Sequence, residues 1–183
     1  MTSRSLTVLI CTHNRSSLLL RTLHYLNMAR RPQGWRVDAI VVANACSDNS
    51  LVDLEQFREK NKDGLPLNWI EEPTPGKSNA LNRALPLIES ELVAFVDDDH
   101  RVDSEYLTNI CAAAEAYPDA ELFCGRILPD WDGSEPAWVH ETGVYRIYPL
   151  PVPRFDQGEI PLSLTPGIAI PGGGNLFLRA EWL

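Results

Sequence analysis

Short apolar runs alternate with segments of helical periodicity over the first 128 residues of the chain. The largely apolar runs predict strands buried in a sheet, at residues 6–11, 37–43, 67–70, 92–96 and 121–127. The segments between them repeat apolar side chains every three or four positions, which predicts helices at residues 18–28, 50–61, 78–88 and 104–117. Strands that alternate with helices predict βαβ units, and hence an α/β fold with a doubly wound, mostly parallel sheet flanked by helices.

Polar loops follow three of these strands. In a doubly wound sheet, ligands bind beyond the carboxyl ends of the strands. The loops at residues 12–15, 44–48 and 97–100 are therefore expected to meet at one edge of the sheet. Ser16 is expected to cap the first helix through its hydroxyl, and Pro86 to distort the last turn of the third.

The chain changes character after Leu128. Eight of its fourteen prolines lie between Pro129 and Pro171, together with Trp131, Trp138, Tyr145 and Tyr148. This stretch carries too many aromatic and branched apolar residues for a low-complexity linker, so an ordered but irregular segment is expected. Three glycines, 172–174, then lead into a sixth predicted strand at residues 175–178.

The net charge and the spacing of the cysteines limit the partners, the metals and the compartment that are expected for the protein. Sixteen Lys and Arg against twenty-five Asp and Glu give a net charge of −9, which disfavours nucleic acid as a partner. The four cysteines are widely spaced without a CxxC pair, so we expect no zinc site, reduced thiols and a cytoplasmic protein. No apolar stretch is long enough for a transmembrane segment, and association with the inner face of a membrane stays open.

Asp97-Asp98-Asp99 is the strongest chemical signal in the chain. Three consecutive carboxylates repel one another unless positive charge lies between them, and Mg²⁺ or Mn²⁺ commonly bridges carboxylates to substrate phosphates. In an extended backbone, Asp97 and Asp99 point to one side while Asp98 points away. The triplet therefore predicts a metal site at Asp97 and Asp99; the alternative is a solvated acidic turn.

The remaining loops are weaker signals. Gly76-Lys77-Ser78-Asn79 places a lysine and free N–H groups at a helix start, which suits phosphate, although an ordinary helix start capped by Ser78 has the same pattern. Thr12-His13-Asn14-Arg15 is able to hold a base or ribose, and otherwise is a polar loop that caps the next helix. The chain has no GxGxxG after its first strand, no P-loop spacing and no GxSxG or HExxH sequence, which disfavours dinucleotide, P-loop, hydrolase and zincin chemistry.

Taken in order, these loops resemble those of the family-2 glycosyltransferases with the GT-A fold. The residues 12–15 resemble the family's "TYNR", and residues 41–48 its "VVDNGSTD". Further along, residues 76–82 resemble "GKSxAxNxG", residues 95–99 "FLDxD", and Gly174 to Arg179 "GxNxxFRR". The resemblance covers nearly the whole chain. It implies one GT-A-like domain over residues 1–183, with a nucleotide-sugar-binding half at 1–128 and an incomplete acceptor-side segment at 129–183.

The resemblance also implies a role for each matching residue. The nucleobase pocket would be lined by Thr12, Asn14 and Arg15, with Asn44 near the base or ribose and Lys77 near the pyrophosphate. Asp97 would contact ribose or sugar, Asp98 would belong to the same donor site, and Asp99 would bind Mn²⁺ or Mg²⁺. The donor sugar and the acceptor entrance would be bordered by Gly173, Gly174 and Asn175.

Two departures from the family pattern limit these expectations. Ala43 and Asn44 stand where the family usually has an aspartate that reads the base, which leaves UDP, GDP and dTDP donors open. The family's general base is expected beyond Leu183, and no context singles out one of Glu135, His140, Glu141, Asp156 and Glu181.

The implied function is metal-dependent, inverting transfer of a sugar from a nucleotide-diphosphate donor to an acceptor hydroxyl, in glycan or cell-envelope polysaccharide biosynthesis. The acceptor would be a glycan, a lipid-linked sugar or a small molecule. The alternatives are a non-catalytic nucleotide-sugar-binding core that lacks the base, a sugar-1-phosphate nucleotidyltransferase, and a structural α/β module with an acidic turn.

Overall fold

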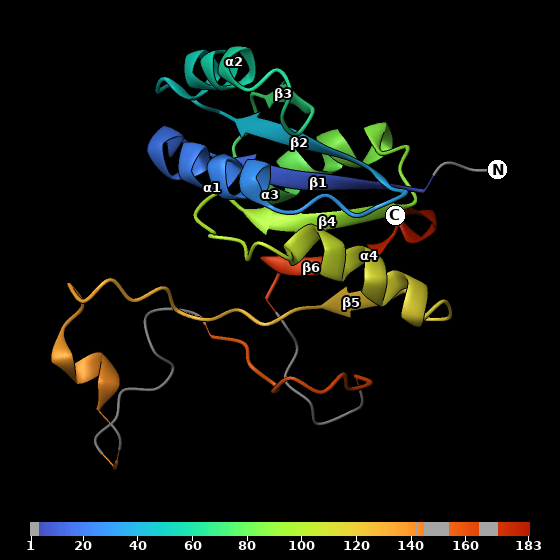
Figure 1. Cartoon of the computed structure of the whole chain (residues 1–183). Coiled ribbons are helices and arrows are strands. Elements are labelled where there is room, and N and C mark those ends of the chain that lie inside the picture. Colours follow the sequence, from blue (N-terminus) through green and yellow to red (C-terminus); the bar gives the residue numbers. More distant parts are fainter. Residues whose placement is uncertain (1–3, 142, 145–153, 165–171) are drawn as a thin grey trace.

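The computed structural model describes residues 4–141, 143–144, 154–164 and 172–183. Helices and strands alternate up to the fifth strand, as the apolar pattern predicts (Figure 1). The strands are β1 (Ser5–Thr12), β2 (Arg36–Asn44), β3 (Leu67–Glu72), β4 (Leu92–Asp97), β5 (Leu122–Cys124) and β6 (Asn175–Arg179). The α-helices are α1 (Ser16–Met28), α2 (Ser50–Lys60), α3 (Lys77–Ala84) and α4 (Tyr106–Ala116), with 3₁₀ turns η1 (Leu85–Leu87), η2 (Ala137–His140) and η3 (Ala180–Trp182).

The six strands form one mixed sheet in the order β3-β2-β1-β4-β6-β5. The first four strands are mutually parallel, with β1 between β2 and β4, so the doubly wound half is confirmed. The other two depart from a simple continuation of it, because β6 lies between β4 and β5 and runs antiparallel to both. In an uninterrupted βαβ series, β5 would pair directly with β4. Here β6, which follows β5 in the chain, takes that position next to β4.

Alternate side chains of the central strands enter two separate cores. Leu6, Val8 and Ile10 of β1 pack in the larger core, which also contains the buried faces of α1, α2 and α4. Leu9 points to the opposite face, where it packs with Ala80 and Ala84 of α3. Helices thus cover both faces of the sheet (Figure 1), and β1 is buried along nearly its whole length, as its apolar run predicts.

Several local predictions need correction. Ser16 is the first residue of α1 rather than its cap, and its hydroxyl donates to the carboxylate of Asp53 instead of accepting from the helix backbone. The 3₁₀ turn η1 contains Pro86, which confirms the predicted distortion, since proline cannot donate the helical hydrogen bond. β5 is only three residues long, against seven predicted, because the pairing with β6 stops where Gly125 meets Asn175.

The segment after residue 128 is irregular where it is described. Figure 1 shows residues 129–141 extending away from the sheet, and a bridge between Ile127 and Phe155 returns the chain toward β5. Much of the predicted acceptor-side segment, including Tyr145 and Tyr148, lies outside the described residues. Over the described ranges, no helix is long and apolar enough to cross a membrane.

Candidate functional site

A cavity of about 360 Å³ opens at the carboxyl ends of β1, β2 and β4. Three loops far apart in the sequence meet there, as the fold predicted from the apolar pattern requires. The residues that line it are Cys11, Thr12, His13, Arg15, Asn44, Lys77, Asp97, Asp98 and Asp99. Six loop residues predicted to bind donor or metal therefore converge with Lys77, which begins α3.

The acidic triplet forms a turn, not an extended strand. Asp97 ends β4, and its carbonyl accepts a hydrogen bond from the N–H of His100 at 3.2 Å. The residues at the two ends of such a turn lie close together. The hydroxyl of buried Thr22, on α1, lies 3.0 Å from the carbonyl of Asp98 and 2.8 Å from that of His100, which fixes the turn against α1.

Asp98 is the buried member of the triplet. Its side chain is 8% exposed, and its Oδ2 accepts a 2.7 Å hydrogen bond from the hydroxyl of Thr12. Arg15 donates to its other oxygen at 3.2 Å. Thr12 and Asp98 thus hydrogen-bond to one another, and their predicted contacts with the donor stay predictions.

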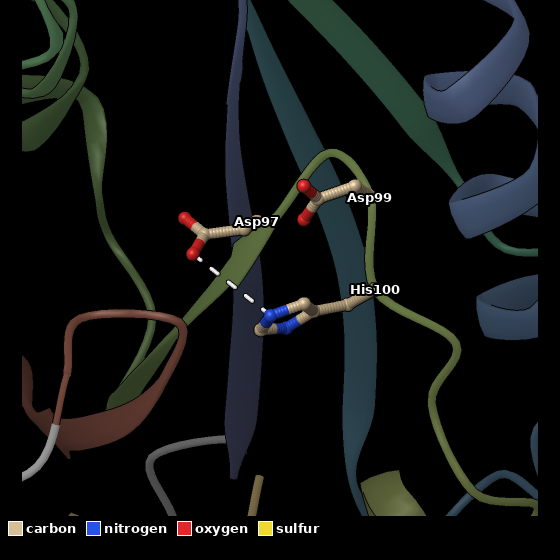
Figure 2. A group of neighbouring side chains, drawn as sticks. All are labelled: Asp97, Asp99 and His100. Atoms are coloured by element: carbon tan, nitrogen blue, oxygen red, sulfur yellow. Dashed lines mark ion pairs between the residues drawn. The ribbon is translucent and has the colours of Figure 1, made fainter. Parts of the chain in front are cut away.

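Asp97, Asp99 and His100 form a group able to hold a divalent cation. One ligand atom from each lies within 4.8 Å of the others. Figure 2 shows the carboxylate of Asp97 and the imidazole of His100 facing one another, 3.9 Å apart at Oδ2 and Nε2, with Asp99 beside them. Carboxylate oxygens suit Mn²⁺ and Mg²⁺, so the donor set fits the predicted ion.

Two cations already lie among the three carboxylates. Lys77 donates to Asp97 Oδ1 at 2.5 Å, and Arg15 lies 3.3 Å from Asp99 Oδ2 as well as contacting Asp98. The repulsion within the triplet is therefore partly offset by the protein itself, which the prediction of a metal from charge alone did not include. Lys77 at the start of α3 and Arg15 beside the turn have the chemistry to bind phosphate oxygens, and their predicted contacts with the donor stay predictions.

Asn44 holds the loop that leads to Lys77. Its Nδ2 donates to the carbonyls of Glu72 and Thr74 at 3.0 and 2.7 Å, and its Oδ1 accepts from the N–H of Gly76 at 2.8 Å. Gly76 has φ +128°, a conformation that favours glycine. Because the Asn44 amide makes all three bonds within the protein, its geometry supports positioning of Lys77, and the predicted contact with base or ribose stays untested.

Asn14 ties the first loop to the second. Its backbone is left-handed, with φ +53°, and its Oδ1 accepts from the N–H groups of Ser47 and Asp48 at 2.7 and 3.2 Å. Asp48 in turn accepts from Ser16 and Ser50. Burial is the largest single influence on Asp48 and opposes its ionisation, but the hydrogen bonds from Ser50 and Ser16 together hold its pKa below the ordinary value. Asn14 does not line the cavity, so its predicted role at the nucleobase is not apparent from its position.

Gly173, Gly174 and Asn175, which were predicted to border the donor sugar, lie in different surroundings. A methyl group added at Gly174 would lie 2.4 Å from His100 Cε1 and 2.6 Å from Asp97 Oδ2, whereas one added at Gly173 would meet nothing within 4 Å. Gly174 thus lies directly against the metal-binding group. Asn175 turns away from the cavity and donates to the carbonyl of Arg126 at 2.9 Å.

None of the five candidate bases lines the cavity in the described part of the chain. Hydrogen bonds from Arg154, Gly158 and Arg126 lower the pKa of Asp156 to about 2, which makes it a weak proton acceptor at neutral pH. Glu135 is engaged by His140 at 2.8 Å, and that hydrogen bond lowers its pKa. The structure therefore assigns no general base.

Three residues at the cavity or beside it had no role assigned to them from the sequence. His100 lies in the metal group, and the only sequence signal for it is its position directly after the triplet. His13 Nδ1 lies 2.7 Å from the carbonyl of Asn44. Burial raises the pKa of the Cys11 thiol to about 11, so this cysteine is a neutral wall of the cavity at physiological pH. All four cysteines are free.

The mixed six-stranded sheet, with a cavity at the carboxyl ends of its parallel strands, is the fold of the GT-A glycosyltransferases. The model of glycosyl transferase family 2 matches residues 7–183, and the chain belongs to this family.

Individual relatives agree with this assignment. The chain is 24% identical over 160 residues to the succinoglycan biosynthesis protein ExoM of Rhizobium meliloti, covering 85% of this chain and 48% of ExoM. It is similar to the mannosyltransferase PcManGT from Pyrobaculum calidifontis in complex with GDP-Man and Mn²⁺, with a TM-score of 0.60 and 26% identity over 67% of this chain and 35% of that one. It also shares the fold of S. aureus TarS in complex with UDP-GlcNAc, with a TM-score of 0.58 and 24% identity over 75% of this chain and 38% of that one. The chain thus spans about half the length of ExoM and a smaller share of the two solved structures.

Proposed function

We propose that this chain forms the donor site of a metal-dependent glycosyltransferase that transfers a sugar from a nucleotide-diphosphate donor to an acceptor hydroxyl. The observation that carries the proposal is the cavity in which Lys77 and Arg15 face the carboxylates of Asp97 and Asp99. A nucleoside diphosphate with a divalent ion needs both kinds of group in one place. The Mn²⁺ and GDP-Man bound by the mannosyltransferase PcManGT support this pairing of ligands.

Each residue of the cavity has a proposed task. Lys77 and Arg15 donate to the diphosphate oxygens, and Asn44 keeps Lys77 in reach through the Gly76 loop. Asp97 and Asp99 hold Mn²⁺ or Mg²⁺, which supplies positive charge beside the leaving diphosphate. Gly174 lies beside this group, directly before β6, and with its neighbours Gly173 and Asn175 it has the proposed task of bordering the donor sugar and the acceptor entrance.

The proposed reaction is a single displacement with inversion. The acceptor oxygen forms a bond to the anomeric carbon as the bond from that carbon to the diphosphate oxygen breaks, and a carboxylate takes the proton of the acceptor hydroxyl. The cations of the site lower the energy of the departing diphosphate. The pathway we propose is polysaccharide biosynthesis, which the similarity to ExoM supports.

A thermal-shift panel tests the donor site. UDP, GDP and dTDP are each added with and without Mn²⁺, and one of them is expected to raise Tm in a Mn²⁺-dependent way. Ligand at one hundred times its Kd adds about 2.7 kcal/mol of stability, or roughly 5–10 °C for a chain of this size. Asp99→Ala is expected to abolish the Mn²⁺-dependent part, while Asp119→Ala, an exposed carboxylate in the turn after α4, keeps it. An unchanged Mn²⁺-dependent shift in Asp99→Ala would defeat the proposal.

Transfer is tested separately from binding. Binding of a donor does not by itself demonstrate transfer, so turnover is measured directly. Release of labelled sugar from the nucleotide identified in the panel, to water or to an added acceptor, would exclude a non-catalytic binder. Release of pyrophosphate from a nucleoside triphosphate and a sugar phosphate would instead support a nucleotidyltransferase.

A further inference from the structure

We propose that His100 is a ligand of the metal ion and that its nitrogen makes the site prefer Mn²⁺ to Mg²⁺. This inference rests on the proposed function, because it concerns the ion that Asp97 and Asp99 hold. It differs from the prediction from sequence, in which only carboxylates bind the metal.

The separation of His100 and Asp97 fits a shared ion better than a direct hydrogen bond. Nε2 and Oδ2 are 3.9 Å apart, which exceeds the 2.7–3.2 Å of N–H···O hydrogen bonds. Two ligand atoms that each lie about 2.1 Å from one ion are at most about 4.2 Å apart. The separation of Nε2 and Oδ2 is below that limit, so one ion between the two facing side chains can reach both atoms (Figure 2).

In Asp97 and in Asp99, one carboxylate oxygen contacts a cationic side chain of the protein. Lys77 binds Oδ1 of Asp97, and Oδ2 faces the imidazole. Arg15 approaches Oδ2 of Asp99. Asp97 Oδ2 therefore faces His100, whose side chain is 26% exposed and so is accessible to an ion from solvent.

Hydrogen bonds to its backbone hold His100 beside Asp97. The turn bond from the His100 N–H to the Asp97 carbonyl and the Thr22 hydroxyl fix its main chain. Gly174 provides the room, because a side chain there would meet both His100 and Asp97. Two hydrogen bonds thus fix the main chain of His100, and the missing side chain at Gly174 leaves space for its ring.

Ligand chemistry then sets the preference. Mg²⁺ favours a shell of oxygen atoms, whereas imidazole nitrogen is a better ligand for transition metals, among which Mn²⁺ is the weakest binder but still accepts it. A site of two carboxylates alone would discriminate little between the ions. His100 therefore shifts the ratio of Mn²⁺ affinity to Mg²⁺ affinity upward.

The test measures metal binding without turnover. Mn²⁺ alone is titrated into the chain and followed by the electron paramagnetic resonance of free Mn²⁺, and Mg²⁺ affinity is obtained by competition. His100→Gln is expected to lower the Mn²⁺-to-Mg²⁺ affinity ratio about tenfold or more. His100→Asp, which restores an oxygen ligand, should recover Mg²⁺ binding without recovering the preference, while His24→Gln, on the exposed face of α1, should leave the ratio unchanged.

A spectroscopic readout makes the test independent of affinity. Electron spin-echo modulation from a coordinated ¹⁴N is expected for Mn²⁺ bound to the unaltered chain and not for His100→Gln. An unaltered ratio and an unaltered ¹⁴N signal in His100→Gln would overturn this inference and leave the donor site intact. Failure of the unaltered chain to bind Mn²⁺, alone or with UDP, GDP or dTDP, would instead overturn the proposed function and this inference together.

Discussion

The hydroxyl of Thr12 donates a 2.7 Å hydrogen bond to Oδ2 of Asp98, and this bond joins the end of β1 to the turn after β4. Both side chains are buried, and Asp97 and Asp99 lie on either side of Asp98 in the chain. The inward carboxylate thus fixes the turn from which its two neighbours reach the cavity. In this arrangement Asp98 contributes to the site by holding its shape.

Thr12→Val should therefore reduce both stability and metal binding. The change keeps the volume but removes a donor from a buried carboxylate, which costs about 1–3 kcal/mol in the free energy of unfolding. Urea unfolding measures the first effect and Mn²⁺ titration the second.

Thr7→Val is the matched control for this prediction. Thr7 is on the same strand and donates a 2.7 Å hydrogen bond to Asp38, away from the cavity. It should lose stability, by about 1 kcal/mol or less because Asp38 is only half-buried, and keep Mn²⁺ affinity. Equal losses of Mn²⁺ affinity in both variants would show that Thr12 acts through general stability alone.

Lys77→Met should separate binding of the diphosphate from binding of the metal. Lys77 lines the cavity and is proposed to donate to phosphate, so loss of this charge-assisted hydrogen bond should weaken binding of the nucleoside diphosphate about tenfold or more. In the structure the same ammonium group pairs with Asp97, so its removal should leave Mn²⁺ affinity without nucleotide unchanged or raise it up to about fivefold.

Isothermal titration of both ligands measures this pair of effects, with Lys60→Met on α2 as the control. The upper limit on the Mn²⁺ gain is small because the Lys77–Asp97 pair is partly exposed to solvent. If Lys77→Met weakened Mn²⁺ binding in the absence of nucleotide, the two groups would not compete as proposed.

Gly174→Ala should impair the metal site with little effect on the fold. The added carbon would lie closer to His100 and Asp97 than atoms normally approach, so one of them must move. We expect Mn²⁺ affinity to fall about tenfold, in the range seen when residues that support metal ligands are changed. Gly172→Ala, with nothing within 4 Å of the added carbon, is the control. Retention of full Mn²⁺ affinity in Gly174→Ala would place the ion elsewhere.

The pattern of apolar residues along the chain was sufficient to predict the parallel half of the sheet, because burial on both faces requires continuous apolar runs such as residues 6–11. The same pattern also predicted that the loops of Thr12, Asn44 and Asp97 meet at one edge of the sheet, since parallel strands end at the same side. It did not predict that β6 pairs between β4 and β5. Strand order beyond the βαβ units depends on contacts distant in sequence, here the register of Val93 with Leu178.

The residue types of the site were determined by the sequence: the acidic triplet at the end of β4, the lysine that begins α3 and the glycines before β6. Which of these side chains face the cavity was decided only by tertiary structure. The turn fixed by Thr22 brings His100 to Asp97, and Thr12 draws Asp98 inward, while Asn44 is used to hold the loop of Lys77. The physical reason is that a polar side chain forms its hydrogen bonds with whichever groups the fold brings near, and those partners come from other strands and helices.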